Sequence, residues 1–276
     1  MVIKHEDVIS SVSFALKEDV GAGDITAALL PEDSTSKATL ISREVAVLCG
    51  SAWFDEVFKQ LDPSIKVEWF ARDGDKVTPD QTICSIEGPT RALLTGERTA
   101  INFLQTLSGT ATTVKSYVEI IKDTNAQILD TRKTIPGLRL AQKYAVTCGG
   151  GKNHRTGLYD AYLIKENHIL AKGSITNAVN EAKKQGLPVE VEVETLNELQ
   201  EALSARADSI LLDNFSLENL KKAVIITQGQ AKLEASGNID KTNLRAVAAT
   251  GVDYISIGSL TKHIKAIDFS MRFEHR

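Results

Sequence analysis

The sequence has little cysteine and no long apolar run. Three of its 276 residues are cysteines, Cys49, Cys84 and Cys148, and they form no CxxC pair. Three cysteines cannot all pair, which argues against a disulfide scaffold and favours a reducing compartment. A membrane-spanning helix needs about 18 consecutive apolar residues and a signal peptide needs an apolar core, and the chain, which starts MVIKHEDVISSV, has neither. We therefore expect a soluble protein of the cytoplasm with no membrane partner.

A large excess of charge is also missing. Lys plus Arg amounts to 32 residues and Asp plus Glu to 36, which gives a net charge of −4. Proteins that bind nucleic acid or anionic membranes through bulk charge are strongly basic, so this composition argues against both partners. Apolar residues make up 42% of the chain, enough for a sizeable core without disulfides or a structural metal. The expected partner is a small molecule or another protein.

The charges are distributed unevenly along the chain. Residues 132–165 contain seven bases and one acid, which gives 7 − 1 = +6. Residues 166–219 contain ten acids and four bases, which gives 4 − 10 = −6. Two adjacent blocks of opposite sign suggest a site that binds an anion beside a cation.

Short apolar runs recur in the second half of the chain. The intervals from Glu192 to Asp213, on to Ser236 and on to Gly258 are 21, 23 and 22 residues, the period of a strand plus a crossover helix. Six such strands favour an α/β barrel with its site at the carboxyl ends of the strands. The predicted strands are Ala126–Arg132, Ala161–Lys165, Val189–Val193, Ser209–Asp213, Ala231–Ser236 and Val252–Gly258, and the predicted helices are Asn197–Ala205, Leu217–Ile226 and Lys241–Thr250.

The first part of the chain lacks this period. Helical and β-like stretches are mixed there, which indicates a separate α+β domain. We place this domain at residues 1–109 and the barrel at residues 110–267, with residues 268–276 packing against the first domain. The predicted helices are Asp7–Lys17, Ala52–Leu61 and Thr95–Leu107, and the predicted strands are Ala38–Ser42, Lys66–Phe70 and Thr82–Ile86.

Basic residues follow the first predicted strands of the barrel. Arg132 and Lys133, with Arg139 soon after, are more cations than a solvated turn usually carries, so we interpret them as an anion site. Lys165 closes the run AYLI, where a structural ion pair explains it as well as a functional role does. The segment Cys148–Arg155, CGGGKNHR, predicts a flexible loop that carries cationic donors, with a plain linker as the alternative.

Glu192 and Asp213 are carboxylates in apolar surroundings. In VEVEV, alternation places the three glutamates on one face, which points into the lumen of a barrel covered by helices. Two carboxylates without a neighbouring His or Cys suit Mg²⁺, which prefers oxygen ligands. An ion pair with Lys165 or Arg132 is the alternative.

Small residues follow the last two strands. Ser236-Gly237 and Gly258-Ser259 stand where barrels commonly bind a phosphate through backbone N–H groups. Each dipeptide alone is also typical of an ordinary turn.

Together these motifs resemble the quinolinate phosphoribosyltransferase family. The blocks TRKT-x-PGLR and NHR-x-GL-x-D-x-x-LIK-x-NH are highly specific. The resemblance extends from Glu18 to about Thr261 and includes EDVGAGDIT, GERTAINFLQTLSGTAT, VEVEVET, LLDNF, LEASGN and DYISIGSLT. It implies an α/β sandwich domain followed by an open α/β barrel, with the phosphate site at the carboxyl ends of the strands. It also implies a homodimer in which the sandwich domain of one chain closes the barrel of the other.

The resemblance implies a reaction and a set of site residues. The reaction is phosphoribosyl transfer from phosphoribosyl pyrophosphate to quinolinate with loss of CO₂, giving nicotinate mononucleotide and pyrophosphate in NAD biosynthesis, with Mg²⁺ as cofactor. The implied quinolinate site is Thr131, Arg132, Lys133, His154, Arg155 and Lys165, with Arg98 from the other subunit. The implied phosphoribosyl pyrophosphate and Mg²⁺ site is Glu192 and Asp213, with the 5-phosphate near Ser236, Gly237, Asn238, Ile257, Gly258 and Ser259. The implied catalytic residues are Lys133, Lys165, Glu192 and Asp213, of which Lys133 or Lys165 returns the proton after decarboxylation.

The chain departs from the family pattern at one point, and other functions stay open. The family often has His directly after Leu-Thr of its last motif, whereas here Lys262 follows and His263 comes one place later, so neither is assigned a role. A molybdate-operon pyrophosphorylase relative would usually lack the LIK-x-NH signature. A barrel that senses a phosphorylated ligand without catalysis would retain the phosphate turns but could lose the acids or bases, which are all present here. Purine-salvage phosphoribosyltransferases carry adjacent acids after an apolar strand, and LLDNF has one.

Overall fold

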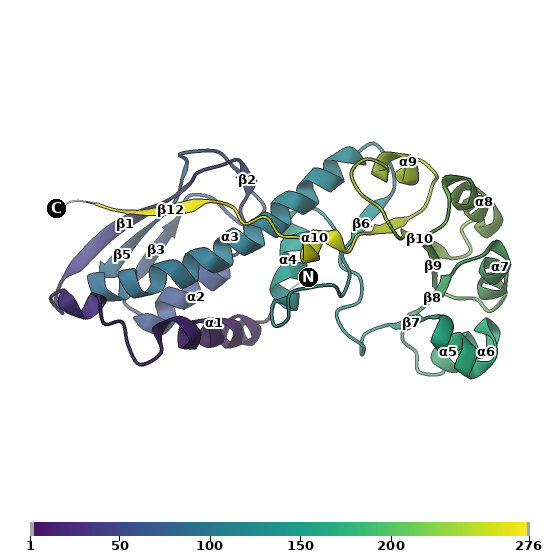
Figure 1. The fold of residues 1–276 in the computed structure, drawn as a ribbon, viewed down its shortest axis with the longest axis horizontal. Helices are drawn as coiled ribbons and strands as arrows, with labels where there is room; N and C mark the ends of the chain where they lie inside the picture. Colours follow the sequence, from purple (N-terminus) through teal and green to yellow (C-terminus); the bar gives the residue numbers. More distant parts are fainter. Residues whose placement is uncertain (1–2, 275–276) are drawn as a thin grey trace. The chain divides into compact units, whose positions relative to one another are not determined.

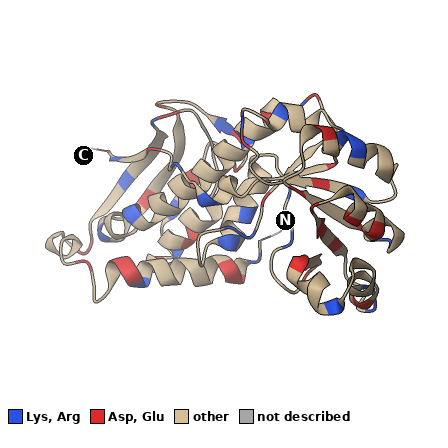
Figure 2. Cartoon of the chain, turned by 45° about the vertical axis from the view of Figure 1, so that its right-hand side comes forward, with Lys and Arg blue, Asp and Glu red and all other residues tan. Residues whose placement is uncertain are grey.

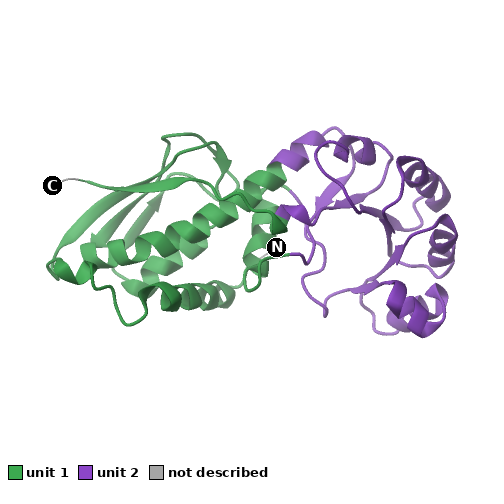
Figure 3. Cartoon of the chain, viewed as in Figure 1, with its two compact units in different colours: residues 1–115, 134–150, 261–276 green, residues 116–133, 151–260 purple. Residues whose placement is uncertain are grey.

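The computed structural model describes residues 3–274 and consists of two compact units (Figure 3). Unit 1 is formed by the chain up to residue 115, by residues 134–150 and by the chain from residue 261. Unit 2 is formed by residues 116–133 and 151–260. The sequence predicts a boundary between residues 109 and 110 and the return of residues 268–276 to the first domain. In the structure the chain re-enters unit 1 from residue 261, and unit 1 also includes residues 134–150, which were not predicted to belong to it.

Unit 1 contains an antiparallel sheet with strand order β12-β1-β5-β3. The strands are β1 (Thr35–Ser42), β3 (Lys66–Trp69), β5 (Thr82–Pro89) and β12 (Phe269–Phe273), and a separate small ladder pairs β2 (Ala46–Val47) with β4 (Lys76–Val77). The helices are α1 (His5–Val20), the short 3₁₀ helix η1 (Ala27–Leu29), α2 (Ser51–Leu61), α3 (Thr90–Ile120) and α4 (Arg139–Cys148). Residues near the carboxyl end of the chain thus join the first sheet, because β12 pairs with β1.

Helices α2 and α3 cover one face of this sheet (Figure 1). In α2 the apolar residues Trp53, Phe54, Val57 and Phe58 recur at helical spacing, so they form one buried stripe. Helix α3 is 31 residues long and extends well beyond the predicted Thr95–Leu107.

Unit 2 contains six parallel strands in the order β6-β11-β10-β9-β8-β7. The strands are β6 (Gln127–Leu129), β7 (Tyr162–Ile164), β8 (Val189–Val193), β9 (Ser209–Asp213), β10 (Lys232–Ser236) and β11 (Tyr254–Ser256). Each lies within a strand predicted from the apolar runs. No pairing joins β6 to β7 within residues 3–274, so the barrel is open there. The helices α5 (Glu166–Lys172), α6 (Ile175–Lys183), α7 (Leu196–Ser204), α8 (Leu217–Thr227) and α9 (Leu244–Ala248) lie on the outer side of this curved sheet (Figure 1).

Side-chain caps fix where the outer helices begin. Ser174, Thr195 and Ser216 each accept a hydrogen bond from the backbone N–H three residues later. In α7, the Glu198 side chain accepts a hydrogen bond from the Thr195 N–H, which completes a capping box. Thr195 and Ser216 follow β8 and β9 closely, so Glu192 and Asp213 lie at the point where each strand turns into its helix. Within the described part of the chain, no helix has the length and apolar composition needed to cross a membrane.

Candidate functional site

The carboxyl ends of β7, β8 and β9 bring together Lys165, Glu192 and Asp213. Lys165 Nζ forms an ion pair with Glu192 Oε2, which is the structural alternative that the sequence left open for both residues. Burial raises the pKa of Asp213, and the nearby charge of Glu192 raises it further. The charges of Lys165 and Lys133 act in the opposite direction. The four predicted catalytic residues therefore interact electrostatically at one edge of the sheet.

The predicted alternation of β8 is confirmed. Val189, Val191 and Val193 are buried on one side of the strand, while Glu190 and Glu192 make their contacts from the other. Alternation places Glu190 and Glu192 on the same face of β8. Glu190, two residues earlier in the strand, is buried, whereas Glu192 near its carboxyl end is only partly buried.

Arg132 and Arg155 lie in the same unit, and Arg132 has an unsatisfied donor that could bind an anion. Arg132 Nε is buried and has no hydrogen-bond partner among the residues that the structure describes. Burial, and then the charge of Arg132, lower the pKa of Arg155. Two neighbouring guanidinium groups repel each other, so an anion between them would relieve the repulsion and supply the missing acceptor. The prediction of an anion site at Arg132 fits this geometry.

Lys133 is positioned by the two turns that follow β6 and β11. Its backbone N–H donates to Thr131 Oγ1 at 3.0 Å. A Cβ atom on Gly258 would lie only 2.8 Å from Lys133 Cδ. The side chain of Lys133 therefore passes directly over Gly258. A larger residue at this position would collide with Lys133, so glycine is favoured here for more than the turn itself.

His154 is held by two buried carboxylates. Its Nε2 lies 2.6 Å from Glu190 Oε2 and 3.5 Å from Glu234 Oε2, while its Nδ1 accepts a hydrogen bond from the Arg155 N–H at 2.8 Å. Burial and the adjacent Glu190 raise the pKa of Glu234 to about 8, with His154 acting in the opposite direction. Sequence reasoning missed Glu234, although an acid within the apolar run AKLEAS was the available signal.

The segment Cys148–Arg155 is not the flexible loop that its glycines predict. Lys152 forms a parallel bridge with Leu129 of β6, and its N–H donates to the Ile128 carbonyl at 2.8 Å. Asp130 then accepts hydrogen bonds from Asn153 Nδ2 and from the His154 N–H, at 2.6 and 2.9 Å. The expectation was wrong because the buried Asp130 carboxylate and the β6 backbone fix the segment after the glycines.

The turn after β10 is a tight network of amides. Gly237 has φ +98°, and a Cβ there would meet Asn214 Oδ1 at 2.1 Å. Asn238 Nδ2 donates to the same Oδ1 at 3.3 Å, and Asn214 Nδ2 donates to Asp213 Oδ2 at 2.8 Å. A cavity of about 110 Å³ adjoins this turn and is lined in part by Ser236 and Gly237. The position suits a phosphate group, because glycine allows close approach to the backbone.

The turn after β11 contains the remaining predicted phosphate residues. The Ile257 N–H donates to the Leu129 carbonyl at 3.1 Å, and Ser259 begins the short helix α10 (Ser259–Lys262). Lys262 and His263 are both exposed.

Unit 2 does not contain every predicted site residue. Arg98 is an exposed residue of α3 in unit 1. Arg139 and Lys143 of the basic block also belong to unit 1, on α4, where Lys143 is fully buried. The basic block is therefore divided between the two units.

Much of the acidic block serves the outer helices. Glu181 pairs with Lys184 and Glu218 with Lys222, and Glu198 caps α7. Figure 2 shows acidic and basic residues distributed over helices of both units. These acids form pairs and caps within the outer helices, so the interpretation of the acidic block as part of one site is wrong for them. For the strand-end residues it stays a prediction.

The chain is similar to known proteins over nearly its whole length. The family model described as quinolinate phosphoribosyl transferase, N-terminal domain, matches residues 24–108, and the one for the C-terminal domain matches residues 110–272. A Bacillus subtilis (strain 168) protein named probable nicotinate-nucleotide pyrophosphorylase (carboxylating) is 41% identical over 257 residues, covering 92% of this chain and 89% of the relative. A chloroplastic nicotinate-nucleotide pyrophosphorylase (carboxylating) from Oryza sativa subsp. japonica is 40% identical, covering 97% of this chain and 78% of the relative.

Solved structures show the same fold. The nicotinate-nucleotide pyrophosphorylase of Francisella tularensis has a TM-score of 0.96 and 50% identity, covering 99% of this chain and 98% of that one. NadC from Streptococcus pyogenes has a TM-score of 0.95 and 40% identity, with coverage of 99% and 98%. The chain belongs to the quinolinate phosphoribosyl transferase family.

Proposed function

We propose that the protein transfers the phosphoribosyl group of phosphoribosyl pyrophosphate to quinolinate and releases CO₂. The pyridine nitrogen forms a bond to the anomeric carbon as pyrophosphate leaves, and the 2-carboxylate then departs as CO₂ and is replaced by a proton. The products are nicotinate mononucleotide, pyrophosphate and CO₂. The observation that carries the proposal is the buried Nε of Arg132, which has no partner among residues 3–274 and lies near Arg155, a pair that suits a ligand with adjacent carboxylates.

Quinolinate orientation is the proposed task of the basic residues. Arg132 and Arg155 would each hold a carboxylate, with Arg98 contributed by a second copy of the chain. His154 directs Nε2 to Glu190 and Glu234, which supports a positioning role for its backbone and ring. Fixed donors around the ring would bring its nitrogen to the anomeric carbon in a reactive orientation.

Glu192 and Asp213 are the proposed holders of Mg²⁺. Their carboxylates offer oxygen ligands on adjacent strands. Burial and then the charge of Glu192 raise the pKa of Asp213, and a cation bound there would relieve the repulsion between the two carboxylates. When bound, Mg²⁺ would neutralise charge on the pyrophosphate leaving group. The two carboxylates would also stabilise positive charge that develops on the ribose as the bond to pyrophosphate breaks.

The 5-phosphate of the ribose would bind between the turns after β10 and β11. Ser236, Gly237 and Asn238 offer a hydroxyl, a close backbone approach and a side-chain amide, and Gly258 with Ser259 offers a second turn. Backbone N–H groups in such turns are common phosphate donors, which supports this placement.

Lys165 and Lys133 are the candidates for the proton donor after decarboxylation. Both influence the pKa of Asp213, so both ammonium groups lie at the edge of the sheet where the ring would be bound. Lys165 forms an ion pair with Glu192, whereas the side chain of Lys133 packs against Gly258. Either ammonium would stabilise the ring carbanion before protonating it.

We also propose that the protein acts as a homodimer in the cytoplasm. Unit 1 exposes large apolar side chains: Phe14 is 73%, Ile25 87% and Leu29 83% exposed. Phe14 lines a cavity of about 720 Å³ within unit 1, formed by residues of α1, α3 and the segment 136–141. Exposed large apolar side chains such as these support contact with another protein surface.

The test is an assay of the purified full chain with Mg²⁺, phosphoribosyl pyrophosphate and quinolinate. We expect release of one CO₂ for each nicotinate mononucleotide formed, and no product from nicotinate. Turnover of nicotinate without turnover of quinolinate would overturn the proposal. Binding of phosphoribosyl pyrophosphate without any product would instead favour a sensor barrel.

A further inference from the structure

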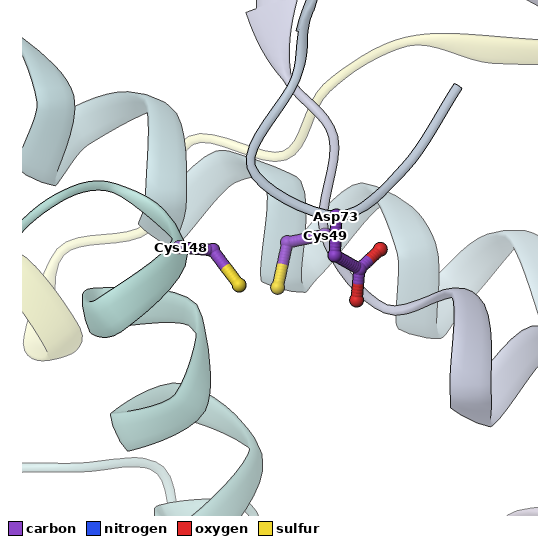
Figure 4. Close-up of side chains that lie close together, drawn as sticks. All are labelled: Cys49, Asp73 and Cys148. Carbon is purple, nitrogen blue, oxygen red and sulfur yellow. The ribbon is translucent and has the colours of Figure 1, made fainter.

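A group of metal-ligating side chains lies within unit 1 (Figure 4). Cys49 immediately precedes the N-cap of α2, Asp73 lies in the turn between β3 and β4, and Cys148 is the last residue of α4. One ligand atom from each of the three lies within 4.8 Å of the others. In Figure 4 the two sulfur atoms face each other, with the Asp73 carboxylate beside Cys49.

The backbone around this group is fixed by hydrogen bonds. The Cys49 N–H donates to Ser108 Oγ at 2.9 Å, and that hydroxyl donates to the Cys49 carbonyl at 3.2 Å. The Gly74 N–H donates to the Leu48 carbonyl at 2.8 Å, which ties the Asp73 turn to the segment that carries Cys49. The first two ligands are therefore presented by a rigid frame, so little ordering is needed on binding.

Asp73 has the supporting contacts expected of a metal-binding carboxylate. Its Oδ2 accepts hydrogen bonds from the Gly50 N–H at 3.1 Å and the Tyr144 hydroxyl at 3.0 Å, and its Oδ1 accepts one from the Ser51 N–H at 3.2 Å. A carboxylate has about four lone-pair positions, so one remains for a metal ion. Such outer contacts orient the ligand and hold it in place.

We propose that Cys49, Asp73 and Cys148 bind one Zn²⁺ ion, with water as the fourth ligand. Thiolate ligands select zinc over Mg²⁺, which requires oxygen. A tetrahedral ion with Zn–S bonds of about 2.3 Å holds its two sulfur atoms about 3.8 Å apart, within the span of this group. Binding forms two Zn–S bonds and one Zn–O bond to Asp73, leaves one water on the ion as it loses its other waters, and releases the two thiol protons, with no change in oxidation state.

The ion would join three separate parts of unit 1. Cys148 lies in the segment 134–150, which is preceded and followed in the sequence by residues of unit 2. Cys49 and Asp73 belong to the N-terminal part of the chain. A ligand that binds the folded state alone raises its stability. We therefore expect Zn²⁺ to raise the thermal midpoint of the full chain.

The proposal is tested with Co²⁺, a spectroscopic substitute for Zn²⁺, added to the full-length protein after reduction by a phosphine and removal of metals by a chelator. We expect a sulfur-to-cobalt charge-transfer band that saturates at one Co²⁺ per chain and is abolished by one equivalent of Zn²⁺. The carboxylates of Glu192 and Asp213 offer only oxygen ligands, so Co²⁺ bound at the proposed Mg²⁺ site produces no such band. The result is thus independent of the proposed enzymatic activity.

Three variants separate a metal site from other thiol chemistry. Cys49→Ala and Cys148→Ala should each abolish the band, while Cys84→Ala, which removes the buried thiol of β5, should leave it unchanged. Cys148 is only half-buried, so its replacement tests the proposal even if the Cys49 variant does not fold. The proposal is overturned if the reduced wild-type chain gives no band or if the band survives loss of Cys148. It is also overturned if Cys49 and Cys148 form a disulfide and the protein binds no cobalt once that disulfide is reduced.

Discussion

Lys165 and Glu192 form an ion pair across the carboxyl ends of the neighbouring strands β7 and β8. The Lys165 side chain remains 44% exposed, so the pair contributes at most about 1 kcal/mol to stability. In the proposed mechanism the pair instead holds an ammonium group beside two carboxylates, where it could donate a proton to the substrate. Loss of Lys165 should therefore affect activity strongly and the free energy of unfolding only slightly.

Replacement of Lys165 by Met should therefore lower kcat strongly without unfolding the protein. We expect a loss of about 10²–10⁴-fold in nicotinate mononucleotide formation, typical of a removed general acid, and a change of less than about 1 kcal/mol in urea unfolding. Lys232→Met is the matched control. Lys232 also forms an ion pair, with Asp253 Oδ1 at 2.6 Å, but it is the first residue of β10 and so lies at the end of that strand away from the proposed site. Equal loss of activity in both variants would contradict a specific role.

Arg132→Met should make the protein more stable and less active. The wild-type Nε is buried without a partner among residues 3–274, and such a donor costs about 1–3 kcal/mol. Removing it, together with the repulsion from Arg155, should raise the free energy of unfolding by about 1 kcal/mol. Loss of a charge-assisted contact should raise KM for quinolinate by about 10–100-fold.

The control for this trade-off is Arg139→Met. Arg139 Nε donates to Thr134 Oγ1 at 3.1 Å, so its removal should bring no gain in stability. Urea titrations and quinolinate saturation curves for the two variants measure both effects. A destabilised Arg132→Met protein would show that Arg132 supports the fold and would remove the argument for a vacant anion contact.

The strands of the barrel could be predicted because their signal is local. Runs such as SILLD and VEVEV combine apolar alternation with a regular interval, and β8 and β9 have the predicted bounds. The ion pair of Lys165 with Glu192 was foreseen as an alternative for the same reason, since strand ends converge in any parallel sheet.

Other features depend on contacts that no local pattern reveals. The return of the chain's end to the first domain was expected, but its pairing as β12 with β1, more than two hundred residues earlier, was not. Segment 134–150 joins unit 1 through packing of α4, which was also not expected. Asp130 fixes a glycine-rich segment that by composition indicates flexibility. Arg98 was identified from the resemblance alone, because an exposed arginine on a helix carries no physical signal in the sequence.

Gly237→Ala should damage the proposed phosphate turn. The new Cβ would lie 2.1 Å from Asn214 Oδ1, so the amide network that also contacts Asn238 and Asp213 must shift. We expect KM for phosphoribosyl pyrophosphate to rise by at least about tenfold, equivalent to about 1.4 kcal/mol of lost binding. Gly173→Ala is the control: φ is +83° and nothing lies within 4 Å, so it bears backbone strain of about 1 kcal/mol without altering KM. Identical KM values for the two variants would contradict a phosphate role for the turn.

Asp55→Asn should stabilise the protein at neutral pH and not at acid pH. Burial, opposed in part by a hydrogen bond from Trp69 Nε1, raises the pKa of Asp55 from 3.8 to about 6. The folded state therefore retains a proton that the unfolded state releases, so stability is highest below about pH 4 and declines as pH rises to about 6. Asn still accepts the Trp69 bond but carries no charge.

The expected gain from Asp55→Asn is about 1–2 kcal/mol in urea unfolding at about pH 7.5, and close to zero at about pH 4. Asp62→Asn provides the opposite case, because hydrogen bonds from Ser64 lower the pKa of the exposed Asp62. That variant should show no gain at either pH. A gain for Asp55→Asn of the same size at both pH values would show that packing, and not ionisation, is responsible.

Mixed dimers test whether a site draws Arg98 from a second chain. If it does, Arg98→Ala and Lys165→Ala chains are each inactive alone, but a mixed dimer has one site in which both residues are intact. Random reassembly makes half of the dimers mixed, so about one quarter of wild-type activity should return. Lys165→Ala mixed with Glu192→Gln is the control, because those residues lie on adjacent strand ends of one chain and no mixed dimer restores a site. Zero activity in verified mixed dimers of the first pair would place Arg98 in the site of its own chain or outside the site altogether.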